Sequence, residues 1–202
     1  MTRIITLIVT FFSVTVAMSQ TQTFESAVKK MYFGVDIIKA SSALVDSFKN
    51  VSCLHYSDTT IVQWDIMTRI ELETDKEAWS NYHTFTFSES PLPGFKINIG
   101  KIKVVIGEAP GIKRLLDVKY SILFDNKIEA EKFYKELIRI FMALSTQHKI
   151  EYDRDIGKMA QFSTRKVEDE GIRDVSFCLG KSFLTKKPEV TFSLMNEFMN
   201  EK

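Results

Sequence analysis

Cysteine is scarce in this sequence: Cys53 and Cys178 are the only two among 202 residues. Two cysteines are too few for a disulfide scaffold, so burial of apolar side chains must hold the fold together. Each lies in an apolar, strand-like pattern, where a free thiol behaves as a small hydrophobic side chain. In an oxidising compartment a disulfide between Cys53 and Cys178 is the alternative, and sequence spacing does not decide between the two.

The chain also lacks a strong net charge of either sign. It has 27 basic and 26 acidic residues, and removal of an N-terminal segment that contains Arg3 would make the two numbers equal. The two signs are interspersed along the sequence. This distribution gives no electrostatic footprint for nucleic acid or for an anionic membrane surface. We therefore expect no nucleic-acid partner and, once the N-terminal segment is removed, no membrane insertion.

Motifs that carry catalysis or metal binding are missing as well. The histidines, His55, His83 and His148, form neither H-x-x-x-H nor H-E-x-x-H, and no G-x-S-x-G is present. Residues 180–182, Gly-Lys-Ser, match the end of a phosphate-binding loop, but Val175 stands where the loop needs a glycine and no helical pattern follows. We therefore predict no catalytic residue, no metal site and no cofactor.

Two weaker chemical patterns remain. Acidic residues recur at 151, 153 and 155, but the glycine and the distal ligand of a calcium loop are absent, so we interpret them as a solvated sheet edge. Catalytic triads are assembled in space rather than in sequence. A small secreted hydrolase built from Cys178, His83 or His148, and the acids near Asp153 is therefore kept as an alternative.

The chain begins with a pattern that indicates export. Arg3 precedes an uncharged apolar run, residues 4–18, which at about fifteen residues is shorter than the roughly 20 that a transmembrane helix needs. Ala17 and Ser19 fit a cleavage site before Gln20. We predict a signal peptide over residues 1–19 and a mature protein that is periplasmic or secreted, with an uncleaved membrane anchor as the alternative.

The clearest single element is a helix predicted over residues 126–146. Asn126 followed by Glu129 has the spacing of a capping box, which satisfies unpaired amides of the first turn. Apolar residues then recur at three- and four-residue steps, with charged residues on the opposite arc. The apolar set is Ala130, Phe133, Leu137, Ile140, Phe141 and Leu144. Such a stripe needs a sheet to cover.

Alternation with a period of two predicts the strands of that sheet. The predicted strands include residues 61–73, 82–87, 116–124, 149–154, 159–166, 174–179 and 189–195. The alternation over 95–106 changes phase at Gly100, which we interpret as a hairpin turn at Gly100-Lys101; one long strand with a bulge is the alternative. The fold class is therefore α+β, with antiparallel sheet covered by helices on one face.

Gly107, Pro110 and Gly111 mark the internal boundary of the chain. It separates a first α+β unit, residues 20–109, from a second, residues 110–202, which could also pack as one domain. A helix near residues 39–48 precedes strands in the first half, and the helix over 126–146 precedes about four strands in the second, so the chain could hold two tandem helix-plus-four-strand units. This order resembles the tandem layout of β-lactamase-inhibitor-like and related small exported envelope proteins.

Three aromatic residues, Trp79, Tyr82 and Tyr152, do not fall clearly on inward faces and are candidate anchors for a partner. With no catalytic motif present, we predict an exported, non-catalytic binding protein, such as an inhibitor, an immunity-type protein or an envelope accessory factor. Its partner would be a protein or ligand in the envelope or outside the cell. Besides the hydrolase, a carrier of apolar small molecules with a pocket between helix and sheet is the alternative.

Overall fold

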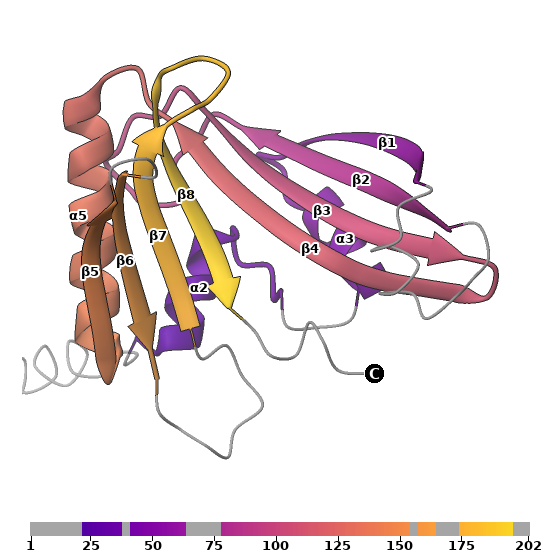
Figure 1. The fold of residues 1–202 in the computed structure, drawn as a ribbon, viewed down its shortest axis with the longest axis horizontal. Helices are drawn as coiled ribbons and strands as arrows, with labels where there is room; N and C mark the ends of the chain where they lie inside the picture. Colours follow the sequence, from indigo (N-terminus) through magenta and orange to yellow (C-terminus); the bar gives the residue numbers. More distant parts are fainter. Residues whose placement is uncertain (1–21, 38–40, 64–77, 154–156, 165–173, 196–202) are drawn as a thin grey trace, which may run out of the picture.

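Eight antiparallel strands form one open sheet in the order β1-β2-β3-β4-β8-β7-β6-β5 (Figure 1). The computed structural model describes residues 22–37, 41–63, 78–153, 157–164 and 174–195. The strands are β1 (His55–Gln63), β2 (Ala78–Phe87), β3 (Ile99–Ala109), β4 (Ile112–Leu123), β5 (Gln147–Asp153), β6 (Gly157–Ser163), β7 (Asp174–Lys181) and β8 (Pro188–Met195). The predicted signal peptide lies outside the described residues, as does the predicted strand over 61–73 beyond residue 63.

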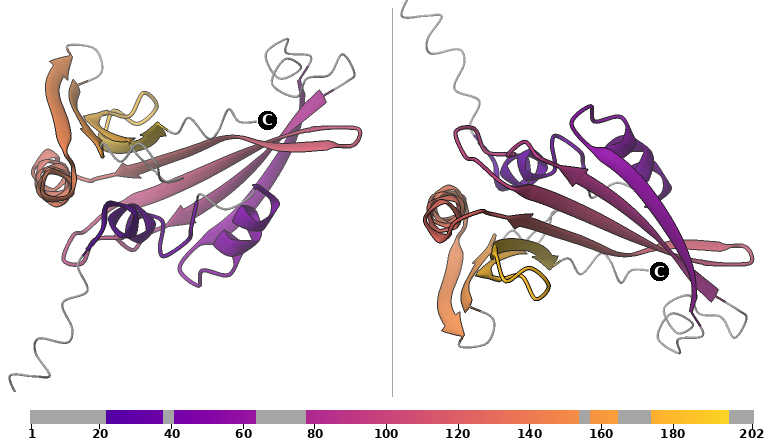
Figure 2. Two further views of the ribbon diagram at one scale, coloured as in Figure 1. Left: turned by 90° about the horizontal axis from the view of Figure 1, so that it is seen from below. Right: turned by 90° about the horizontal axis from the view of Figure 1, so that it is seen from above.

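Within the described part of the chain, three helices pack on one face of this sheet, which confirms the predicted α+β class. They are α2 (Phe24–Met31), α3 (Ser41–Lys49) and α5 (Lys127–Leu144). Figure 2 shows α2 and α3 against the β1–β4 half, with α5 beside the β5–β8 half. Helix α5 begins where the sequence predicts, because the Asn126 side chain accepts a hydrogen bond of 2.9 Å from the Glu129 amide. The Glu129 carboxylate does not complete a capping box and instead binds the Lys132 ammonium at 3.0 Å.

Aromatic rings fill the space between the helices and the sheet. Phe141 of α5 is fully buried and contacts Phe24, Phe162, Phe177 and Phe192, with ring centroids 5.0–6.4 Å apart. Each buried ring removes a large apolar area from water, and edge-to-face pairs add further attraction. The predicted inward residues Phe133 and Leu137 are likewise buried.

The sheet consists of two four-strand meanders joined at their last strands. Residues 120–123 of β4 pair with residues 189–192 of β8, and the two strands then spread apart along the rest of their length (Figure 1). In sequence order, α3 and β1–β4 form one helix-plus-four-strand series, and α5 and β5–β8 form the other. Pro110 and Gly111 form the turn of the β3–β4 hairpin, so the division proposed at residues 109/110 falls in a turn within the sheet.

The predicted hairpin turn at Gly100-Lys101 is wrong. Strand β3 runs unbroken from Ile99 to Ala109 and pairs along its length with β2 and β4. Gly100 lies opposite Phe87, and a Cβ atom at this position would be 2.0 Å from the Phe87 ring. The glycine therefore makes room for an aromatic ring of the neighbouring strand, a long-range requirement that resembles a turn in the sequence.

Candidate functional site

The face of the sheet away from the helices, hereafter the open face, has no described helix packed on it. Successive side chains of a strand point to opposite faces of the sheet. The residues that alternate with the buried core residues along each strand therefore point to the open face. They are mainly hydroxyl-bearing and charged, and include Tyr82, Thr84, Thr86, Lys101, Lys103, Asp117, Lys119, Ser121, Thr191 and Ser193. This face is therefore mainly polar around β4 and β8.

A hollow of about 490 Å³ lies on the open face where β4 and β8 separate. We call it the β4–β8 cleft. Its lining combines apolar residues with lysines and hydroxyl groups, namely Lys101, Lys103, Asp117, Val118, Lys119, Tyr120, Ser121, Thr191, Phe192, Ser193 and Leu194. The cleft thus brings together strands that are separated by about 70 residues in the sequence, an arrangement that only the β4–β8 pairing produces.

Lysine side chains gather at one side of this cleft. Lys103 of β3 lies directly opposite Lys119 of β4 in the strand register, and Lys101 lies two residues away on the same face of β3. Like charges at directly opposed positions destabilise a sheet. Desolvation, followed by the charges of Lys119 and Lys101, lowers the pKa of Lys103, and Asp117 opposes this effect only in part. The site therefore carries an excess of positive charge.

Two neighbouring side chains hold these lysines in place. The Lys103 ammonium lies 3.9 Å from the centroid of the Tyr82 ring, a cation–π contact. The Lys119 ammonium forms an ion pair of 3.2 Å with Asp117. With three lysines against one aspartate, and with the hydroxyls of Ser121 and Thr191 nearby, the cleft offers donors and charge to a carboxylate or another anionic group.

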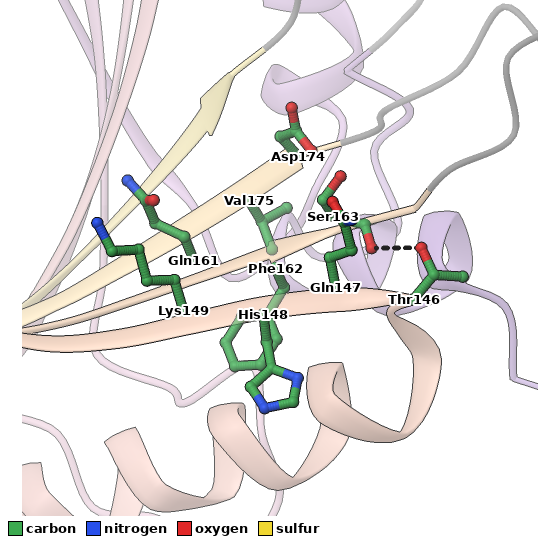
Figure 3. Close-up of a pocket in the computed structure, with 9 residues that line it drawn as sticks. All are labelled: Thr146, Gln147, His148, Lys149, Gln161, Phe162, Ser163, Asp174 and Val175. Carbon is green, nitrogen blue, oxygen red and sulfur yellow. Dashed lines mark hydrogen bonds between the residues drawn. The ribbon is translucent and has the colours of Figure 1, made fainter.

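A second recess, of about 690 Å³, lies across β5, β6 and β7 (Figure 3). His148 stacks on Phe162 with centroids 6.2 Å apart, while Lys149 forms an ion pair with Glu151 at 2.5 Å. In Figure 3 the His148 ring points toward α5, whereas Lys149 and Gln161 project elsewhere. Thr146, Gln147, Ser163 and Asp174 lie together at the other end of the recess, where the Thr146 hydroxyl donates to the Ser163 carbonyl at 3.3 Å. Its polar groups are therefore divided between separate places, which makes it a weaker candidate than the β4–β8 cleft.

A third group of polar side chains lies on the helix-covered side of β1, β2 and β3. The Tyr56 hydroxyl and the His83 Nδ1 are 2.9 Å apart, and desolvation followed by the Lys49 charge lowers the pKa of His83. The Trp79 indole donates to Glu108 at 3.3 Å. Burial alone would raise the Glu108 pKa, but hydrogen bonds from Lys113, Asn81 and Trp79 outweigh it and lower the pKa. These groups satisfy one another.

The structure does not bring the three predicted aromatic anchors together. Trp79 and Tyr82 lie on opposite faces of β2, and Tyr152 lies on β5 at the far edge of the sheet, where it is 75% exposed. Tyr82 alone is beside the β4–β8 cleft, beneath Lys103. The sequence does not identify Lys101, Lys103 and Lys119 as a site, because Lys119 comes next to the other two only through the β3–β4 register. The local signal is the spacing of Lys101 and Lys103, which places both on one face of a strand.

The residues of the hydrolase alternative are likewise separated. Cys178 lies on the open face between Met159 and Thr191, whereas His83 and His148 pair with the buried residues Val104 and Phe162 on the other face. No disulfide joins Cys53, in the loop before β1, to Cys178, in β7. Within the described residues, no group of three or more His, Cys, Asp or Glu side chains could hold a metal ion.

Comparisons with protein-family models, with curated proteins and with solved structures found no match. The resemblance to β-lactamase-inhibitor-like proteins therefore rests on the order of elements. Among the described helices, none has both the length and the apolar character needed to cross a membrane.

Proposed function

We propose that this chain is an exported, non-catalytic binding protein that holds an acidic segment of a partner protein in the β4–β8 cleft. The observation that carries the proposal is the placement of Lys101, Lys103 and Lys119 side by side on the open face. Bringing like charges together costs stability in the free protein. An acidic partner would neutralise these charges and would gain rate and specificity from complementary electrostatics.

The packing of the core favours a binding surface over an internal carrier site. Phe141 and the rings of Phe177 and Phe192 occupy the space between α5 and the sheet, which is where a carrier would need its cavity. The open face, in contrast, has polar and charged side chains around a hollow large enough for several partner residues. This arrangement suits an inhibitor, an immunity-type protein or an envelope accessory factor.

The proposal is tested by cross-linking capture from the native envelope or medium with three forms of the protein. The first is the unaltered protein, the second carries Lys103→Glu and Lys119→Glu, and the third carries Lys30→Glu and Lys135→Glu. Lys30 and Lys135 are exposed on α2 and α5, so the third form has the same change of charge on the other side of the molecule. We expect one partner to be captured by the first and third forms only.

Salt dependence provides a second criterion. Binding through the lysines should weaken strongly between 50 and 500 mM NaCl. The Debye length falls to about 4 Å at the higher concentration, so the attraction between the lysines and an acidic partner is screened. Equal capture by the Lys103→Glu/Lys119→Glu form, or capture that does not respond to salt, would refute the role of the cleft. Export is tested separately, since the processed protein should begin at Gln20 on N-terminal sequencing.

A further inference from the structure

The loop between β7 and β8 presents two apolar side chains almost entirely to solvent. Phe183 is 86% exposed and Leu184 is 88% exposed. Other exposed apolar residues of the described sheet are less prominent, for example Ile112 at 38%. The loop projects at one end of the molecule (Figure 1). Two adjacent large apolar side chains at the tip of a projection form a candidate contact surface.

Hydrogen bonds fix the conformation of this loop. The Ser182 amide donates to the Lys187 carbonyl, and the Lys186 amide donates to the Ser182 carbonyl, each at 2.9 Å. Ser182 itself is buried, and its hydroxyl accepts a weak hydrogen bond of 3.5 Å from the Thr185 amide. The tip is thus presented on a closed turn, so little conformational entropy would be lost when it enters another medium.

The loop also has a local excess of positive charge, despite the balanced charge of the whole chain. Residues 181–187 contain three lysines, Lys181, Lys186 and Lys187, and no acidic residue. Lys187 is neutralised by an ion pair of 2.9 Å with Asp125. The Lys186 ammonium lies 4.8 Å from the centroid of the Phe183 ring. Two lysines therefore remain beside the apolar tip without a carboxylate partner in the loop.

The start of α5 extends this surface. The ion pair between Lys187 and Asp125 ties the loop to the segment just before the helix. Ile128, in the first turn of α5, is 65% exposed. Lys127 beside it is exposed as well, and its ammonium lies 3.8 Å from the Glu131 carboxylate. The start of α5 therefore adds a further exposed apolar side chain, Ile128, at this end of the molecule.

We propose that the β7–β8 loop is a peripheral membrane anchor, in which Phe183 and Leu184 enter the headgroup region of an anionic phospholipid surface and Lys181 and Lys186 contact its phosphates. Apolar side chains flanked by lysines have the composition that binds such surfaces. A pocket of a partner protein would accommodate the apolar tip, but the lysines favour the anionic lipid. The proposal departs from our expectation that the mature chain has no electrostatic footprint for an anionic membrane surface. In this proposal only the side chains of Phe183 and Leu184 enter the lipid layer, and no segment crosses it.

Lys186 provides an informative substitution because its backbone has φ 58. This left-handed conformation is unfavourable for a side chain and natural for glycine. Lys186→Gly should therefore preserve the turn while it removes one charge. We therefore attribute a loss of binding in this variant to the lost ammonium group, including its contact with the Phe183 ring.

The test is co-sedimentation of the processed protein, without the apolar run over residues 4–18, with vesicles of phosphatidylcholine alone or with 30% phosphatidylglycerol. We expect binding to the anionic vesicles and at least about tenfold weaker binding for Phe183→Ser/Leu184→Ser. Lys186→Gly should weaken binding to anionic vesicles about fivefold and leave binding to neutral vesicles unchanged. The matched control Ile112→Ser, at the β3–β4 turn, should bind as the unaltered protein does.

Depth of insertion gives an independent measurement. In a Phe183→Trp variant, vesicles with brominated acyl chains should quench the new tryptophan fluorescence, whereas in an Ile112→Trp variant they should not. The proposal is overturned if the unaltered protein stays in the supernatant with anionic vesicles, if the Phe183→Ser/Leu184→Ser form sediments equally well, or if Phe183→Trp is not quenched. The first of these results would direct attention to a protein pocket as the site that receives the loop.

Discussion

Replacement of Gly100 by alanine should destabilise the protein, although the same change in a strand is ordinarily neutral or favourable. The new Cβ would lie 2.0 Å from the Cε2 and Cζ atoms of Phe87, and ordinary contact begins near 3.4 Å. Phe87 is buried and packs on Phe33 and Tyr120, with centroids 4.8 Å and 5.8 Å away. The ring would have to move by more than an ångström in a space already filled by other rings.

The magnitude follows from two opposing effects. Overpacking of a filled core costs about 1–3 kcal/mol, and we expect the upper half of that range because the clash involves a rigid ring. Loss of glycine flexibility in the unfolded chain returns roughly 0.4–1 kcal/mol. The free energy of unfolding should therefore fall by about 2 kcal/mol, which lowers Tm by about 4–8 °C for a chain of this size. Urea denaturation followed by circular dichroism measures the change.

Gly107 provides the matched control. A Cβ there would be 2.8 Å from Cδ1 of Leu116, the end of a flexible and partly exposed side chain. Gly107→Ala should change the free energy of unfolding by no more than about 0.5 kcal/mol. In a Phe87→Leu background the cost of Gly100→Ala should shrink by at least about 1 kcal/mol, since the two residues are in contact. A Gly100→Ala protein as stable as the unaltered one would refute the proposed packing of β2 against β3.

Three further predictions concern the helix α5 and its surroundings. Asn126→Ala should lower the free energy of unfolding by about 1 kcal/mol in urea denaturation, because the Glu129 amide loses its acceptor. Phe141→Ala should cost about 3–5 kcal/mol by the same measurement, since the side chain is fully buried among other rings. Hydrogen bonds from Lys187 and Asn98 lower the Asp125 pKa. The ionised carboxylate therefore stabilises the folded protein fully at a pH above the ordinary pKa of aspartate, and this stabilisation is lost as the pH falls through the lowered pKa. Lys187→Met should raise the Asp125 pKa, as measured by NMR titration of the carboxyl carbon.

The sequence predicted those elements whose signals are local. Helix α5 has its start signal and its apolar stripe within a single stretch, and the structure has the helix there, capped by Asn126 and ending at Leu144, two residues before the predicted end. The four strands that follow α5 also appear near their predicted positions, because apolar and polar residues alternate along them in the sequence. Patterns of this kind need no knowledge of the neighbouring strand.

Prediction failed where the reason for a residue lies in another part of the chain. Gly100 is small because Phe87, thirteen positions earlier, lies over it; sequence alone offered a turn as the simpler explanation. The candidate site was missed for the same reason, since Lys103 and Lys119 become neighbours only through the β3–β4 register. No spacing rule for a single strand contains that information.

Charge is the property for which the fold changes the conclusion most. The whole chain is nearly neutral, with 27 basic and 26 acidic residues, yet acidic side chains are used in pairs along the helices, such as Glu136 with Arg139 and Glu129 with Lys132. Those pairs are locally neutral. The lysines of the β4–β8 cleft and of the β7–β8 loop, in contrast, are in local excess at two separate places, one suited to a polar partner and one to an interface with an apolar layer. A net charge near zero therefore excludes neither kind of contact, because electrostatic recognition depends on the local field rather than on the sum.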